Sequence, residues 1–252
     1  MWLILGDDAD PCLRWAADGL VGRGLAPVKL LTAARLGPGL RWEHRVGVTG
    51  GTVEITLGDG VLIRSSHLRG VLNRLGAPPG WPLLDRVHVQ DRDYVRQELA
   101  AFFLSWLASL PQPMLNRPTP QGLAGAWRHP AEWVLLAAKA GLRTTPYRAS
   151  NRDRPDAAAG RSQRLGVRTG AAATKVLVIG GQAVGTAPLA ILSACRRLGV
   201  LSGTALLGVE LDGVAAGPWT FAGATPRPDL RDGGEPALDA LAEALQASGG
   251  QL

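Results

Sequence analysis

The chain has 252 residues, and 46% of them are hydrophobic, which excludes a disordered protein because enough apolar side chains are present to form a core. The formal charge of +6 suggests binding to nucleic acid, but the basic residues are scattered and only two Tyr and three Phe could stack on bases. We therefore interpret the charge as background composition. Nucleic-acid binding stays as a third hypothesis that the charge alone supports.

The cysteine content and the N-terminal residues indicate where in the cell the protein is located. Cys12 and Cys195 each lie in an apolar, helix-like segment, so we expect both in the core rather than in a disulfide or metal site. The N-terminal sequence becomes acidic at Asp7, without the basic start and long apolar run of a secretory signal. No stretch reaches the ~18 consecutive apolar residues that span a bilayer. The prediction is a cytoplasmic protein with no membrane partner.

The N-terminal part of the chain predicts a parallel, doubly wound sheet. A buried strand, an amphipathic helix and a second buried strand are expected at residues 2–5, 11–22 and 28–31. Three carboxylates, Asp7, Asp8 and Asp10, follow the first strand, at the end of such a sheet where ligands often bind. Their place in a turn before a helix also fits a structural role, which we favour.

The middle of the chain alternates strands and helices. Apolar and polar residues alternate in a predicted hairpin at 45–64, and a further strand is expected at 71–74. The clearest helix is predicted at 91–110, with Tyr94 among the apolar side chains of its buried face. Two more elements are predicted, a short strand at 114–118 and a helix at 130–141.

The C-terminal part opens with a weakly periodic segment, residues 149–173, which we predict to be a mobile loop. A hairpin is expected around Gly180 and Gly181, between strands at 176–179 and 183–186. The remaining predicted elements are a helix at 189–198, strands at 204–211 and 219–221, and a closing helix at 236–247.

The order of short segments along the chain carries a family resemblance. It rests on the segments Leu72-Asn73-Arg74, Leu115-Asn116-Arg117-Pro118, Trp127-Arg128-His129-Pro130 and Lys175-Val176-Leu177-Val178. Further on, Glu210 precedes Ala222 by twelve positions. This order and spacing resembles the RimK-like ATP-grasp ligases, including those that modify ribosomally made peptides.

The resemblance implies an α/β fold in two parts. Residues 1–118 correspond to a Rossmann-like pre-ATP-grasp domain, and residues 119–252 to a truncated ATP-grasp-like α+β domain. It also implies that Glu210 occupies the position of a metal-binding carboxylate. Lys175, His129 and Arg128 occupy or adjoin positions that matter for the nucleotide, although helix capping is the simpler interpretation of His129.

Departures from the family pattern concern the groups that handle a triphosphate. Ala222 and Ala224 stand where the family has Glu and Asn metal ligands, and Ala173 stands where it has Asp. Phosphoryl transfer needs Mg²⁺ held by several oxygens and cations that neutralise the moving charge. One remaining carboxylate, Glu210, is a poor magnesium site. We therefore predict no catalytic residues and expect no cofactor.

Two functions follow from this pattern. The leading hypothesis is a non-catalytic pseudo-ATP-grasp protein that binds a protein or peptide partner, such as a full-length ATP-grasp enzyme, in a peptide-modification or amide-ligation pathway. The alternative is a divergent ATP-dependent carboxylate–amine ligase. It would use ATP and Mg²⁺, with Glu210 on the metal and Lys175, His129 and Arg128 on the nucleotide.

Overall fold

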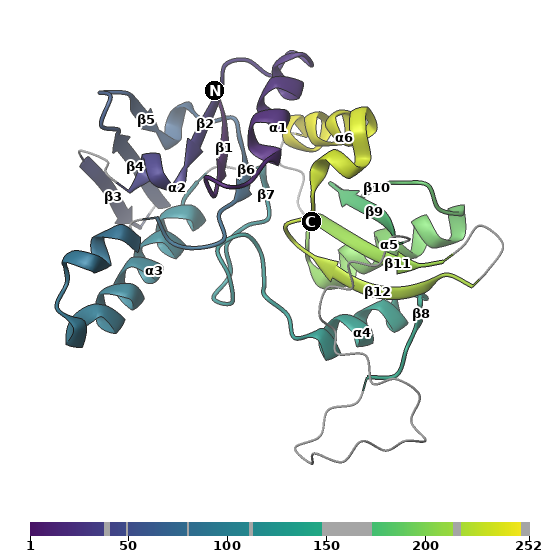
Figure 1. Cartoon of the computed structure of the whole chain (residues 1–252). Coiled ribbons are helices and arrows are strands. Elements are labelled where there is room, and N and C mark those ends of the chain that lie inside the picture. The colour runs from purple at the N-terminus through teal and green to yellow at the C-terminus, as the bar shows by residue number, and fades with distance from the viewer. Residues whose placement is uncertain are drawn as a thin grey trace. The chain divides into compact units, whose positions relative to one another are not determined.

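A computed structural model of the chain describes residues 1–37, 41–48, 50–79, 81–110, 113–147, 173–213 and 218–247 (Figure 1). The chain divides into two compact units: Met1–Trp127 together with Asp229–Leu252, and Arg128–Pro228. The division after Trp127 differs from the predicted one after residue 118. The C-terminal helix belongs to the first unit as well, because it packs against the first helix of the chain.

The first unit contains a parallel sheet of four strands in the order β2-β1-β6-β7. Its strands are β1 (Trp2–Gly6), β2 (Val28–Thr32), β6 (Gly70–Arg74) and β7 (Met114–Leu115). All three neighbouring pairs run parallel, which confirms the predicted parallel sheet. The central strands β1 and β6 are buried along their whole length, as apolar strands covered on both faces must be.

Two helices from opposite ends of the chain, α1 (Cys12–Val21) and α6 (Gly234–Gln246), pack against each other and against this sheet. Their approach is close, because a Cβ atom at Gly19 would lie 2.4 Å from a methyl carbon of Leu238. A larger residue at Gly19 would require the Leu238 side chain or the helices to shift. The contact explains why the last segment of the chain belongs to the first unit.

A three-stranded antiparallel sheet and a long helix complete the first unit. The sheet has the order β3-β4-β5, and its strands are β3 (Arg41–Gly47), β4 (Gly50–Thr56) and β5 (Leu62–Arg64). Helix α3 (Arg92–Ala108) buries Phe103, Trp106 and Leu107 in a core shared with both sheets. Tyr94 is 66% exposed, so its predicted place on the buried face is wrong: the first turns of α3 are mostly exposed.

Short elements connect these parts. They are α2 (Ala33–Leu36) and the 3₁₀ helices Ser65–His67, Trp81–Arg86, Val89–Asp91 and Leu230–Gly233. The predicted hairpin at 45–64 is confirmed as β4 and β5, whereas β3 was not predicted as a separate strand.

The second unit is a five-stranded sheet covered by two helices. Its elements are α4 (Pro130–Lys139), β8 (Arg143–Thr144), β9 (Ala173–Ile179), β10 (Gln182–Val184), α5 (Leu189–Ser202), β11 (Leu206–Asp212) and β12 (Thr220–Thr225). The strand order is β10-β9-β11-β12-β8. The β9–β10 pair confirms the predicted hairpin at Gly180 and Gly181, which both have positive φ angles of 56° and 85°.

Three further predictions can be compared with the structure. Most of the predicted loop at 149–173 lies outside the described residues, and Ala173 is the first residue of β9. Both cysteines are buried, as expected. In the part of the chain that is described, no helix is long and apolar enough to cross a membrane.

Candidate functional site

One face of the second unit's sheet packs against α4 and α5, and the opposite face carries charged side chains beside buried aliphatic residues. The packed face joins residues of α4 and α5, such as Trp133, Ala194 and Leu198, to Val176 and Val209 of the central strands. Neighbouring residues of a strand point to opposite faces. The residues next to Val176 and Val209 therefore point away from the helices.

Lys175 and Glu210 are the charged pair on this opposite face. They lie directly across from each other on β9 and β11, so their side chains share a face of the sheet. Lys175 is exposed and Glu210 is partly exposed. The structure thus brings together two residues that the sequence analysis connected to the nucleotide and the metal. ATP and metal binding by these residues stays a prediction.

Strand β12 decides what else faces Glu210. Gly223 is its partner across the ladder, and Oε2 of Glu210 lies 3.8 Å from the position that a Cβ atom of Gly223 would occupy. A bulge between the pairs of Glu210 and Leu211 makes Ala222 the extra residue. Ala224 pairs with Val209 and packs against the core beneath the helices.

This register corrects the expectation that Ala222 and Ala224 both stand where ligands would approach Glu210. Ala224 points to the opposite face, because it is the partner of Val209 rather than of Glu210. The residue that faces the carboxylate is Gly223, which offers no side-chain oxygen. Sequence spacing alone could not reveal a bulge that shifts the face of each residue beyond it.

Asp212 is a candidate that the sequence analysis missed. It follows Glu210 by two residues on β11, so the two carboxylates share a face, with their Cα atoms about 7 Å apart. The alternation Glu210-Leu211-Asp212 at a strand end was the available signal. Among the described residues, no group of three or more His, Cys, Asp or Glu side chains is placed to hold a metal ion.

Arg128 and His129 lie at the start of α4, on the side of the sheet that the helices cover. The Nδ1 atom of His129 accepts a hydrogen bond from the Ala131 N–H at 3.2 Å, so His129 caps the helix. Arg128 donates to the Ser202 carbonyl at 2.9 Å and pairs with Glu132. These contacts confirm the capping interpretation and connect α4 to the end of α5. The structure does not bring either residue to Glu210.

The three carboxylates after β1 have structural partners. Asp7 accepts a hydrogen bond from the Gly76 N–H at 3.1 Å, and Asp8 accepts one from the Ala34 N–H at 2.9 Å. Asp7 and Asp8 therefore tie the end of β1 to the segments that follow β6 and β2. The favoured structural interpretation of this acidic turn agrees with these bonds.

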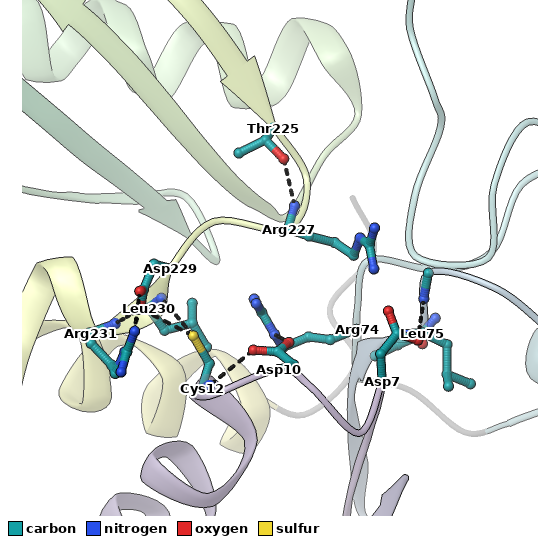
Figure 2. Close-up of polar contacts among 12 residues, drawn as sticks. Asp7, Asp10, Cys12, Arg74, Leu75, Thr225, Arg227, Asp229, Leu230 and Arg231 are labelled. Carbon is teal, nitrogen blue, oxygen red and sulfur yellow. Dashed lines mark hydrogen bonds and ion pairs between the residues drawn. The ribbon is translucent and has the colours of Figure 1, made fainter. Parts of the chain in front are cut away.

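Asp10 belongs to a polar cluster with Arg74 and Cys12 (Figure 2). It accepts hydrogen bonds from Arg74 Nε at 2.6 Å and from the Cys12 N–H at 2.9 Å. Burial would raise the pKa of Asp10, but the hydrogen bond and charge of Arg74, with the Cys12 N–H, outweigh it and lower that pKa. Arg74 Nη1 is buried and has no hydrogen-bond partner among the described groups.

The same cluster includes the chain segment that precedes α6 (Figure 2). The Cys12 thiol donates to Asp229 Oδ1 and accepts from the Leu230 N–H, both at 3.2 Å. Hydrogen bonds from Arg231 hold the pKa of Asp229 well below its usual range, whereas burial raises the pKa of Cys12 to about 11. The cluster thus connects the start of α1 to the chain segment before α6.

Known proteins resemble this chain in structure only. No protein-family model and no curated protein matches the sequence. The macrocyclase MdnC from Microcystis aeruginosa MRC, bound with the precursor peptide MdnA, superposes with a TM-score of 0.71 at 16% identity, over 98% of this chain and 100% of that one.

Two further solved structures give the same result. An ATP-grasp ligase associated with ribosomally synthesised and post-translationally modified peptides (RiPPs), from Chryseobacterium gregarium and in complex with ADP, a leader and a core peptide, has a TM-score of 0.69 at 8% identity, over 97% and 96% of the two chains. The ATP-grasp ligase PsnB, complexed with minimal precursor, Mg and ADP, has a TM-score of 0.66 at 14% identity, over 97% and 98%. At these identities the similarity establishes the fold. The chain has a mixed α/β, ATP-grasp-like fold over nearly its whole length.

Proposed function

We propose that this protein is a non-catalytic member of a peptide-modification pathway, which binds a peptide or a modifying enzyme without turning over ATP. The observation that carries the proposal is the register at Glu210, where Gly223 faces the carboxylate and the partly buried Ala224 packs against the core on the opposite face. The three structural neighbours named above hold precursor, leader or core peptides. That shared property supports a peptide as the partner of this fold.

The chemistry of phosphoryl transfer supports the same conclusion. Mg²⁺ requires near-octahedral oxygen ligands, and its carboxylates must converge on one point between the phosphates. Asp212 shares the face of Glu210, but it lies on the same strand, and β12 supplies no side-chain oxygen opposite Glu210. The loss of one electrostatic contributor costs roughly 3–4 kcal/mol of transition-state stabilisation, and several losses together leave almost no rate. The proposal therefore includes no cofactor.

A divergent ATP-dependent carboxylate–amine ligase is the second candidate. The observation that favours it is the shared face of Lys175, Glu210 and Asp212, which places two carboxylates of β11 beside a cation of the neighbouring strand β9. In such an enzyme, Glu210 and Asp212 would hold Mg²⁺ together with phosphate oxygens, and Lys175 would neutralise a phosphate. His129 and Arg128 have no part in this arrangement because their bonds stabilise the packing of α4 and α5.

Calorimetric titration with ATP and Mg²⁺ separates the two candidates. The non-catalytic proposal expects no binding tighter than about millimolar, a Kd that corresponds to roughly −4 kcal/mol. Micromolar binding that is lost in Glu210→Ala, and retained in the matched surface variant Glu132→Ala on the other side of the sheet, would overturn it. The ligase alternative also requires ADP release that depends on an amine acceptor.

A second measurement tests the peptide. If a precursor peptide is encoded beside this protein, a fluorophore-labelled copy of that peptide is expected to bind the wild type and the Glu210→Ala variant with equal affinity. Equal affinity is the expected result because the proposal gives Glu210 no role in peptide recognition. Failure of neighbouring precursor peptides and of a neighbouring ATP-grasp enzyme to bind would contradict the proposal.

A further inference from the structure

Strand β3 is an exposed edge. Of the described strands only β4 pairs with it, and in Figure 1 it lies at the outer side of the three-stranded sheet. Val46 is 72% exposed and Val48 is fully exposed, although aliphatic side chains are usually covered. A seven-residue strand with an unpaired edge is a template for another strand, and proteins normally block such edges.

The hairpin geometry determines which backbone groups of β3 are free. Gly47 pairs with Gly50 across a two-residue loop, and such a closing pair exchanges backbone hydrogen bonds. Alternate residues of a strand direct their N–H and C=O groups to opposite edges. Arg41, Glu43, Arg45 and Gly47 therefore bond to β4, whereas the backbone groups of Trp42, His44 and Val46 point to the free edge.

The sequence of β3 is self-complementary in one antiparallel register. We propose that β3 pairs with β3 of a second copy of the chain, with His44 opposite the partner's His44, in a symmetric dimer. This register places Trp42 opposite the partner's Val46 and Glu43 opposite the partner's Arg45. It also aligns the free N–H and C=O groups of Trp42, His44 and Val46 with those of the other copy.

The neighbouring registers bring like charges together. A shift that centres the pairing on Glu43 opposes two glutamates and sets Arg41 against the partner's Arg45. A shift that centres it on Arg45 opposes two arginines. Like charges directly across a ladder are destabilising, so of these three neighbouring registers only the one centred on His44 is complementary in charge. Register is thereby specified by side chains that sit on the surface of the monomer.

Exposure of the side chains agrees with this pairing. Glu43 lies between Arg41 and Arg45 on the solvent face and is 19% exposed, whereas the arginines are 69% and 76% exposed. The guanidinium groups of the two arginines are therefore exposed enough to pair with a carboxylate of a second copy. Trp42, which stacks on Phe102 at 5.8 Å between ring centroids, is only partly buried. The partner's Val46 would cover its open edge and lose its own exposure to water.

Sedimentation velocity over a dilution series tests the dimer. Three pairs of edge residues make a small interface, so the expected Kd is on the order of 10 µM. Glu43→Arg and Arg45→Glu each oppose like charges across the dimer and are expected to weaken it at least tenfold. The double variant Glu43→Arg/Arg45→Glu opposes unlike charges again and is expected to restore it. Failure of the double variant to restore the dimer overturns the register.

Val46→Pro provides a sharper test of the edge itself. The Val46 N–H points away from β4, so proline removes a bond to the partner without breaking the hairpin. Asp93→Asn, which removes one partner of the exposed Arg96–Asp93 pair on α3, is the control and should leave the dimer unchanged. A wild type that is monomeric up to ~100 µM, or a dimer that persists in Val46→Pro, refutes the proposal. Far-UV circular dichroism confirms that each variant is folded.

Discussion

The buried ion pair between Asp10 and Arg74 makes a quantitative prediction. Their side chains are 13% and 4% exposed, and the Nε–Oδ2 distance is 2.6 Å. Asp10→Asn keeps the shape and the acceptor for the Cys12 N–H but removes the negative charge. The guanidinium of Arg74 is then buried without compensation, and the free energy of unfolding is expected to fall by about 3–5 kcal/mol.

Two further variants separate the charge from the packing. The double variant Asp10→Asn/Arg74→Met removes both charges, and it is expected to lie within ~1 kcal/mol of the wild type because no unpaired ion remains. Asp93→Asn removes one partner of the exposed Arg96–Asp93 pair, whose side chains are 46% and 83% exposed, and should cost less than ~1 kcal/mol.

Urea unfolding followed by far-UV circular dichroism measures all four proteins. If Asp10→Asn costs no more than Asp93→Asn, then the pair is solvated in solution, and the assignment of Arg74 as a buried cation is wrong. If the double variant is as unstable as Asp10→Asn, then the loss comes from shape and hydrogen bonding rather than from charge.

Three more outcomes are expected. Ellman's reagent should not react quickly with the folded protein at pH 8, because burial raises the pKa of Cys12 to about 11 and of Cys195 to about 12. Both thiols should react after unfolding. Fast reaction of a thiol in the native protein would contradict this expectation. Because the pKa of Asp229 is lowered, the stability that it contributes is present above the unfolded value of about 3.9 and is lost as pH falls through the folded value. Melting temperature should therefore drop below pH 4 in the wild type, and less so in Asp229→Asn; parallel profiles would count against this. Gly223→Asp places a second carboxylate opposite Glu210, so Mn²⁺ should raise the melting temperature of this variant. Ala224→Asp places a charge against the core, so this variant should be destabilised and should not respond to Mn²⁺. The reverse pattern would show that the register is wrong.

Most elements of the fold could be predicted from the sequence because their apolar residues recur at the period of a helix or a strand. The buried strands β1 and β6, for example, are short apolar runs that end in turn-forming or polar residues. Strand β3 was not predicted, because its solvent face carries Arg41, Glu43 and Arg45, which hide the strand pattern. The buried face of that strand depends on α3, whose contribution becomes visible only in the fold.

The polar contacts of the candidate site were less predictable, for a physical reason. Asp10 meets Arg74, and Cys12 meets Asp229, across long stretches of chain, and no local pattern encodes such a contact. Lys175 and Glu210 were both identified from the sequence, but their pairing depends on the register of β9 and β11. The bulge at Ala222 had no sequence signal at all.

The bulge determines which positions of β12 could place a metal ligand beside Glu210. Ala224 packs against the core beneath the helices, so an Asn at this position would bury an amide that has no bonded partner there, at a cost of roughly 1–3 kcal/mol. Substitution of the two alanines is therefore insufficient to rebuild a ligand set around Glu210. The bulge would also have to move by one residue, which would turn position 224 to the face of Glu210 and position 223 to the core. A strand with this register can therefore keep the packing of the sheet while it places no side-chain oxygen directly opposite Glu210.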